Sequence, residues 1–168
     1  PRVAIEYDPF GRVTRRSNPD GTFTTRTYTP GTVTLTDENG HQTVQTWQAF
    51  GHPDDARMTS LLDADQKRWS YGYHVMGELW TVVAPDGRTR TWLYSGLHLL
   101  SSETHPETGT TTYDYDSAGR LFKKTDANNV PTTYSYDANN RIQAISTGSR
   151  VTAFGYESGS DNQQWTSS

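Results

Sequence analysis

Tyr115-Asp116-Ser117-Ala118-Gly119-Arg120-Leu121 is followed 21 residues later by Tyr136-Asp137-Ala138-Asn139-Asn140-Arg141-Ile142. The same pattern opens the chain as Tyr7-Asp8-Pro9-Phe10-Gly11-Arg12-Val13. A fixed period close to 20 residues indicates that one small structural unit is laid down repeatedly. The pattern therefore favours a scaffold or an interaction surface over an enzyme.

Aromatic anchors carry this period over most of the chain. The step between successive anchors averages about 21 residues, so 168 residues hold about eight units. Only the stretch from 28 to 73 departs from the period, with steps of 19 and 26 residues. The anchors are Tyr7, Tyr28, Trp47, Tyr73, Tyr94, Tyr115, Tyr136 and Tyr156. We expect Tyr94, Tyr115 and Tyr136 to stack in register as an aromatic ladder on one face of a sheet.

A second set of turn signals falls halfway between the anchors, as in Asn18-Pro19-Asp20-Gly21 and Ala84-Pro85-Asp86-Gly87. Proline presets the first turn angle, aspartate and asparagine bond their own backbone, and glycine accepts a positive φ. Each unit should therefore contain two turns and two strands of roughly six residues. The predicted turns lie near residues 9–11, 18–21, 38–40, 85–87, 106–109, 117–119, 127–129 and 138–140.

The segments between the turns have the composition of strands. Residues 32–36, Thr-Val-Thr-Leu-Thr, alternate strictly, and Trp69, Tyr71 and Tyr73 share one strand face. The nearest helical pattern, Asp54 to Leu62, follows Pro53 and favours at most a turn or two of helix. We therefore predict an all-β fold in which antiparallel hairpins of about 21 residues form a curled, spiralling sheet, part of a hollow shell.

Composition limits the kind of sheet that can form. Apolar residues, tyrosine included, make up 32% of the chain, which is low, while aromatic residues reach 12% and the net charge is only -4. Such a chain is too aromatic for a disordered segment and too polar for a thick core. We expect a thin core of tyrosine, tryptophan, threonine and a few aliphatic residues, with one apolar face or two moderately polar ones.

Several functional classes lack support. The chain has no cysteine, its five histidines share no metal-ligand spacing, and it contains no phosphate loop, nucleotide fingerprint or nucleophile elbow. We predict no catalytic residue, no metal and no cofactor. A pI near 5.7 argues against nucleic-acid binding, and there is no apolar run that would span a membrane and no targeting signal. Arg88, Arg90 and Trp92 share one strand face, an arrangement suited to stacking on a sugar or binding an anion.

The repeat also bears on how the chain ends. Residues 3–7 already have strand character, and no capping pattern closes the chain. Terminal strands of a sheet are unpaired edges that neighbouring repeats or caps normally cover. We therefore expect residues 1–168 to be one repeat segment of a longer polypeptide, with a weaker repeat match over residues 148–168.

The Tyr-Asp-x-x-Gly-Arg-Leu/Val motif, recurring near every 21 residues with a turn between copies, resembles the Rhs repeat, also called the YD repeat. The copies at Trp47 and Tyr73 lack the Tyr-Asp or the Gly-Arg pair. The repeat-defining residues are Tyr7, Asp8, Gly11, Arg12, Tyr28, Tyr73, Gly77, Tyr94, Tyr115, Asp116, Gly119, Arg120, Tyr136, Asp137 and Arg141.

The resemblance implies a non-catalytic segment of a β-shell that encloses a C-terminal toxin or effector domain, delivered or secreted from a bacterial cell. The shells of insecticidal toxin complexes and of teneurins are related. The implied partners are the flanking repeats, the enclosed domain, and a delivery-apparatus protein or a glycan. The alternative is a YD-repeat module that binds carbohydrate or a cell surface, for which contiguous exposed rings would be the distinguishing sign.

Overall fold

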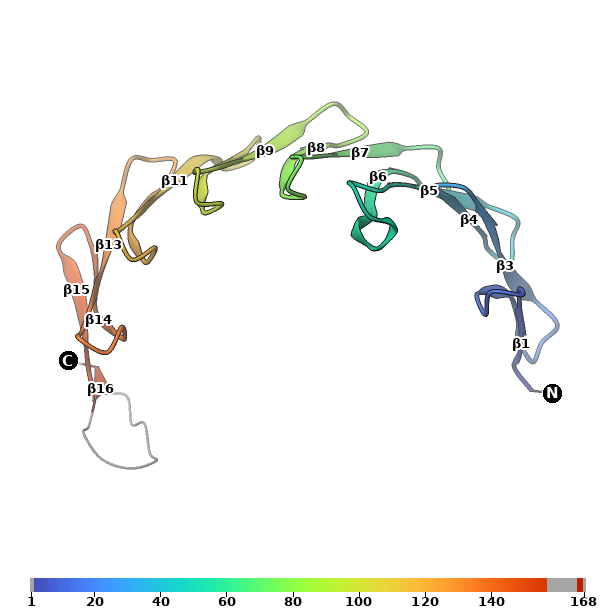
Figure 1. The fold of residues 1–168 in the computed structure, drawn as a ribbon, viewed down its shortest axis with the longest axis horizontal. Coiled ribbons are helices and arrows are strands. Elements are labelled where there is room, and N and C mark those ends of the chain that lie inside the picture. Colours follow the sequence, from blue (N-terminus) through green and yellow to red (C-terminus); the bar gives the residue numbers. More distant parts are fainter. Residues whose placement is uncertain (1, 157–165, 168) are drawn as a thin grey trace. The chain divides into compact units, whose positions relative to one another are not determined.

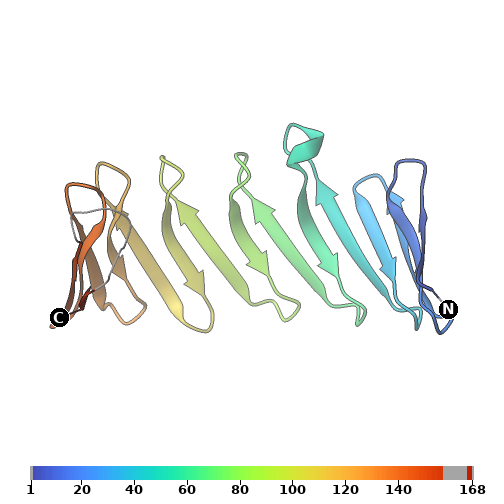
Figure 2. The same ribbon diagram turned by 90° about the horizontal axis from the view of Figure 1, so that it is seen from below.

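The computed structural model describes residues 2–156 and 166–167, and nearly all of its regular structure is β-strand. The chain forms two compact units, Pro1–Thr89 and Arg90–Ser168. Within each unit, successive strands lie side by side in one layer (Figures 1 and 2). The predicted all-β class with consecutive antiparallel hairpins is confirmed. Of the stretch 148–168, where we expected a weaker repeat match, residues 157–165 and 168 lie outside the described residues.

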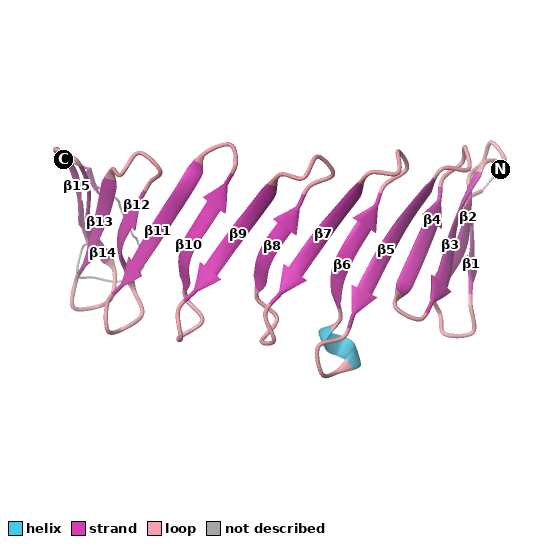
Figure 3. Ribbon diagram, turned by 90° about the horizontal axis from the view of Figure 1, so that it is seen from above, coloured by secondary structure: helices cyan, strands magenta, loops and turns pink. Residues whose placement is uncertain are grey.

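In the first unit each strand pairs antiparallel with the next one along the chain. Figure 3 shows the resulting series of hairpins. The strands are β1 (Ala4–Tyr7), β2 (Val13–Ser17), β3 (Phe23–Thr29), β4 (Thr32–Thr36), β5 (Gln42–Gln48), β6 (Arg57–Leu62), β7 (Arg68–Tyr73) and β8 (Leu79–Val83).

The second unit repeats this arrangement, again with each strand antiparallel to its successor. Its strands are β9 (Thr89–Tyr94), β10 (Leu100–His105), β11 (Gly109–Tyr115), β12 (Leu121–Thr125), β13 (Pro131–Tyr136), β14 (Ile142–Thr147), β15 (Arg150–Gly155) and β16 (Thr166–Ser167).

One loop geometry recurs at both ends of the strands. In the loop after β11, the Asp116 N–H donates to the Arg120 carbonyl and the Gly119 N–H donates to the Asp116 carbonyl, both at 2.9 Å. The residue in the Gly119 position has a positive φ, which explains why glycine or asparagine usually stands there. Ten described turns share both bonds, and they begin at Asp8, Asn18, Asp37, Asp63, His74, Ala84, Ser95, Asp116, Asp126 and Asp137.

This loop type confirms seven of the eight predicted turns, and the Thr108 N–H donating to the His105 carbonyl at 3.3 Å confirms the turn at 106–109. Of the turn or two of helix that the sequence allowed between Asp54 and Leu62, the structure contains only a short one. A 3-10 turn covers Pro53–Asp55 only, and residues 57–62 form β6. The β-branched Thr59 and the alternation of side chains suit a strand better than a helix.

Strand pairing sorts the side chains onto two different faces, because successive side chains point to opposite sides. Thr32, Thr46, Ser60 and Ser70 lie opposite one another across four strands. We call their side of each sheet the hydroxyl face; in the second unit it holds Ser102, Thr112 and Thr125. The other side, the ring face, holds Tyr28, Val33, Leu61 and Trp69 in the first unit and Tyr113, Tyr134 and Ile145 in the second.

No side chain is fully buried among the residues whose exposure is described. Large apolar side chains remain accessible, including Trp47 at 38% and Phe122 at 42%. A one-layer sheet has no second layer against which to pack, so its stability comes from strand pairing and from contacts between side chains on the same face. The expected thin core is therefore two half-buried faces, one rich in rings and one rich in hydroxyls.

Candidate functional site

The Tyr-Asp-x-x-Gly-Arg motif builds a small ionic turn. In the first copy, Asp8 Oδ1 accepts the backbone N–H groups of Phe10 and Arg12 at 2.9 Å, and Asp8 Oδ2 accepts Arg12 Nε at 2.7 Å. Asp116 holds Arg120, and Asp137 holds Arg141, in the same way, with Nε–Oδ2 distances of 2.7 Å. The aspartate thus closes the loop and fixes the direction of the guanidinium group.

These hydrogen bonds also set the protonation of the aspartates. The backbone N–H of Arg120 lowers the pKa of Asp116, and the Arg120 guanidinium adds to this effect against some loss of hydration. Asp137 has a lowered pKa for the same reasons, with Arg141 as the donor. Both carboxylates are therefore ionised when they hold their arginines.

Each fixed arginine then stacks on the tyrosine of the next repeat. The guanidinium carbon lies 4.2 Å from the ring centre of Tyr28 for Arg12, and 4.7 Å from Tyr136 for Arg120. The tyrosine hydroxyl donates back across the hairpin, from Tyr28 to the Val13 carbonyl at 2.9 Å and from Tyr136 to the Leu121 carbonyl at 2.7 Å. We call a ring, the arginine over it and the carbonyl that accepts its hydroxyl a Tyr–Arg clamp.

The clamp revises the predicted aromatic ladder. Tyr136 stacks with Arg120, and no contact between the rings of Tyr115 and Tyr136 is found among the described residues. The repeating feature is an alternation of guanidinium groups and rings. Desolvation raises the pKa of Tyr115, which shows that this ring is partly sheltered without an arginine over it.

Tyr156, an anchor that was left out of the repeat-defining residues, forms a further clamp. Tyr156 lies under Arg141 at 4.1 Å and donates to the Ile142 carbonyl at 2.7 Å, so its one-residue offset does not remove the clamp. Arg57 directly precedes Met58, whose carbonyl accepts the Tyr73 hydroxyl at 3.1 Å. Arg57 stands 16 positions before Tyr73, as Arg12 does before Tyr28, but the described contacts do not place its guanidinium over the Tyr73 ring.

The structure places the remaining repeat-defining residues as follows. Tyr7 ends β1 with 59% of its surface exposed. Gly11, Gly77 and Gly119 all take the positive φ of the common loop. Tyr73 meets Phe50 edge to face at 5.8 Å. Glu78 and Leu99 stand 16 positions before Tyr94 and Tyr115, at the place where a clamp has arginine.

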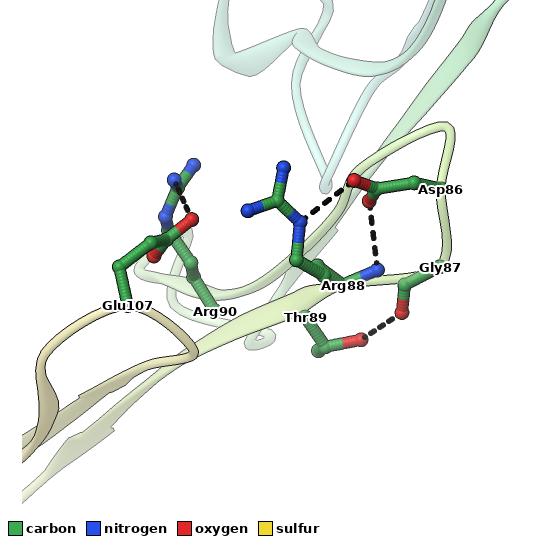
Figure 4. Close-up of polar contacts among 6 residues, drawn as sticks. All are labelled: Asp86, Gly87, Arg88, Thr89, Arg90 and Glu107. Atoms are coloured by element: carbon green, nitrogen blue, oxygen red, sulfur yellow. Dashed lines mark hydrogen bonds and ion pairs between the residues drawn. The ribbon is translucent and has the colours of Figure 1, made fainter.

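The arginines proposed for ligand stacking hold carboxylates of the chain itself. Arg88 Nε lies 2.6 Å from Asp86 Oδ2, and Arg90 Nη2 lies 2.8 Å from Glu107 Oε1 (Figure 4). Trp92 meets His105 edge to face at 5.7 Å. An anion or a sugar at this place would have to compete with these contacts.

A polar cluster surrounds Glu103 on the ring face of the second unit. The Tyr113 hydroxyl donates to Glu103 Oε1, and His105 Nε2 lies 3.4 Å from Glu103 Oε2. The hydrogen bond from Tyr113 lowers the pKa of Glu103, while desolvation and the same bond raise the pKa of Tyr113. Cross-strand contacts account for this cluster, which ties β10 to β11.

Groups of three or more histidine, aspartate or glutamate side chains able to hold a metal are absent from residues 2–156 and 166–167. In the same residues no helix has the length and apolar character to cross a membrane.

A one-layer sheet of repeated hairpins, joined by aspartate turns, defines a class of β-repeat protein. The RHS Repeat family model matches residues 94–124 and 115–152. The RHS repeat is therefore recognised within residues 94–152 of this chain. No curated protein matches it.

Solved structures with the same fold come from toxin complexes. A TcdB2-TccC3 crystal structure matches 94% of this chain with a TM-score of 0.76 and 16% identity. TcdB2-TccC3 without its hypervariable C-terminal region matches 92% with a TM-score of 0.74 and 18% identity. The Tc holotoxin pore of Photorhabdus luminescens matches 92% with a TM-score of 0.72 and 18% identity. The chain spans about 9% of the length of each of these proteins.

Proposed function

We propose that this chain is a non-catalytic wall segment of an Rhs-type β-shell, which encloses a toxin or effector polypeptide fused C-terminal to it. Residues 1–168 would act as one repeat segment, with the flanking repeats and the enclosed chain as partners. The protein that carries it would be secreted or delivered from a bacterial cell.

One observation carries the proposal: the sheet is a single layer with no fully buried side chain among those described. Its ring face exposes large apolar groups such as Trp47, and Leu97, in the turn after β9, is 76% exposed, whereas the hydroxyl face is suited to water. Exposed apolar surface of this kind normally marks contact with another chain. The likeness in fold to toxin-complex structures supports an enclosed toxin as that chain.

The test compares the full-length protein with a variant that lacks residues 3–147. We expect deletion to increase toxicity to the producing cell and to expose the C-terminal domain to protease. Gly96→Ala is the control, since nothing lies within 4 Å of a Cβ added there; it should change neither readout.

The carbohydrate-binding alternative gives a different result. If deletion changes neither toxicity nor protease protection, and the purified chain binds a defined glycan, containment is wrong and the chain is a binding module.

A further inference from the structure

The Tyr–Arg clamp is interrupted at Trp47. The arginine of a clamp stands 16 positions before its ring in the pairs Arg12–Tyr28 and Arg120–Tyr136. The same position before Trp47 is occupied by Gly31, which has no side chain. Among the described contacts, no arginine lies over the Trp47 ring.

The backbone prevents an arginine from standing at position 31. Gly31 has a φ of +69°, and a Cβ added to it would lie 3.1 Å from the Trp47 carbonyl oxygen. The Trp47 N–H donates to the Gly31 carbonyl at 2.7 Å, which holds the two residues together. A side chain here would be strained by its dihedral angle and by the close approach. Residue 31 therefore cannot supply the group that covers Trp47.

Trp47 borders an open groove of about 450 Å³. Small residues leave room beside the ring, namely Gly31, Ala49 and Ala56, and the groove also contacts Arg12 and Tyr28 of the preceding clamp. The volume lies in the range of small-molecule sites, about 300–1,000 Å³. The Trp47 side chain remains 38% exposed, so its ring is available to a ligand.

Arg12 is the charged residue that lines the groove. Arg12 already has its carboxylate, with Nη2 at 2.7 Å from Asp8 Oδ2. Arg120 and Arg141 show that successive repeats each accept a guanidinium when an aspartate accompanies it. Next to the groove, Asp55 directly precedes Ala56 and makes no side-chain contact among those described.

We propose that the groove at Trp47 binds an arginine side chain of a partner polypeptide, which supplies from outside the guanidinium that the other clamps supply from within. Tryptophan is the best aromatic partner for a cation, and the planar guanidinium stacks better than an ammonium group. The proposal stands on the clamp geometry and does not depend on containment.

Fluorine NMR of the whole chain, labelled with fluorotryptophan, tests this site. The chain has five tryptophans, and Trp47→Phe identifies the Trp47 signal by its loss. The probe is a short peptide with one arginine between glycines. We expect it to shift the Trp47 signal saturably, and the matched peptide with citrulline, which is flat but uncharged, to bind about threefold to tenfold more weakly.

Two further variants make the test specific. Ala56→Leu should fill the groove and abolish the shift while the Trp47 signal remains. Tyr136→Trp should give a new tryptophan signal that the peptide does not shift, because Arg120 covers the ring. In the double variant Tyr136→Trp/Arg120→Gly the peptide should shift this signal. The proposal would be overturned if the arginine and citrulline peptides bound equally, or if the arginine peptide did not shift the Trp47 signal. It would also be overturned if the peptide did not shift the new tryptophan signal of the double variant.

Discussion

At the scale of single residues, the tyrosine hydroxyl and the arginine do different things within one clamp. The hydroxyl of Tyr136 reaches a backbone carbonyl on β12, so it links two strands that its own strand pairing already joins. Arg120 joins the Asp116 turn to the ring of the next hairpin. Both contacts connect successive repeats, which a single hairpin cannot provide for itself.

We therefore expect Tyr136→Phe to lower the free energy of unfolding by about 1 kcal/mol, the usual net value of one hydrogen bond. Urea denaturation measures it. Tyr134→Phe is the matched control, because the Tyr134 hydroxyl makes no hydrogen bond among the described contacts. Equal losses in both variants would show that the Leu121 carbonyl contact contributes nothing.

Arg120→Ala removes the stacking and the ion pair together. Partly exposed contacts of these two kinds are each worth up to about 1 kcal/mol. We expect a total loss of about 1–2 kcal/mol by urea denaturation, with only part of it recovered in Arg120→Lys, since lysine keeps the charge without the planar group. Full recovery by lysine would show that charge alone matters.

The lowered pKa values of Asp116 and Asp137 predict sensitivity to acid. A group with a depressed pKa in the folded state stabilises the fold above its unfolded pKa of about 3.9, and this stabilisation is lost as pH falls through the folded value. The urea midpoint should thus drop below about pH 4. The variant Asp116→Asn/Asp137→Asn should start with a lower midpoint and show a smaller drop, and an unchanged drop would contradict this assignment.

How far the sequence predicts these residues depends on spacing. Asp8, Gly11 and Arg12 lie within one loop, so the motif reveals their contacts directly. The hydrogen bond from Tyr73 to the Met58 carbonyl could not be assigned, because the loop before β6 is longer and separates Met58 from the preceding anchor Trp47. The stacking of arginine on the next ring joins residues 16 positions apart on neighbouring hairpins, which periodicity alone does not specify.

At the scale of the hairpin, the common loop decides where each strand ends. Most turns with Gly or Asn at the positive-φ position were predicted, since those residues adopt it at little cost, although the turn at Gly77 was not among them. Turns that place Gln66 and His98 there, with φ of 62° and 60°, were not predicted, because neither residue signals a turn. Pairing of the flanking strands imposes the loop at these two sites.

Gly119 separates dihedral strain from steric crowding. An added Cβ would meet only Leu99 Cδ1, at an ordinary 3.8 Å, so the positive φ of 78° is the sole obstacle. We expect Gly119→Ala to cost about 1–2 kcal/mol in urea denaturation. Gly119→Asn should cost less, since Asn140 occupies the same position in the next repeat with φ 63°. Equal costs would place the strain elsewhere.

At the scale of the whole molecule, the described contacts run only between strands that follow one another in the chain. Stability in such a repeat is a sum of local terms, so damage should stay local. Gly72 is the sharpest site for a test, because a Cβ there would lie 2.5 Å from Thr81 Cγ2 and 2.8 Å from the Trp80 indole nitrogen.

We expect Gly72→Val to increase amide hydrogen exchange in β6, β7 and β8 and to leave β11 to β14 unchanged. Gly96→Ala is the matched control, since nothing lies within 4 Å of its added Cβ. Faster exchange throughout both units would mean that the chain unfolds as one cooperative body.

The two unlike faces also constrain how genes for such proteins change length. Removing one strand would reverse the direction of every later strand and move its turns to the opposite edge, and a one-residue slip would exchange rings for hydroxyls. Losing or duplicating a whole hairpin of about 21 residues keeps both faces and the alternation of turns. Length variation among homologous genes should therefore come in whole hairpins or in loops, where the extra residues before β6 lie and leave the alternation of strands unchanged.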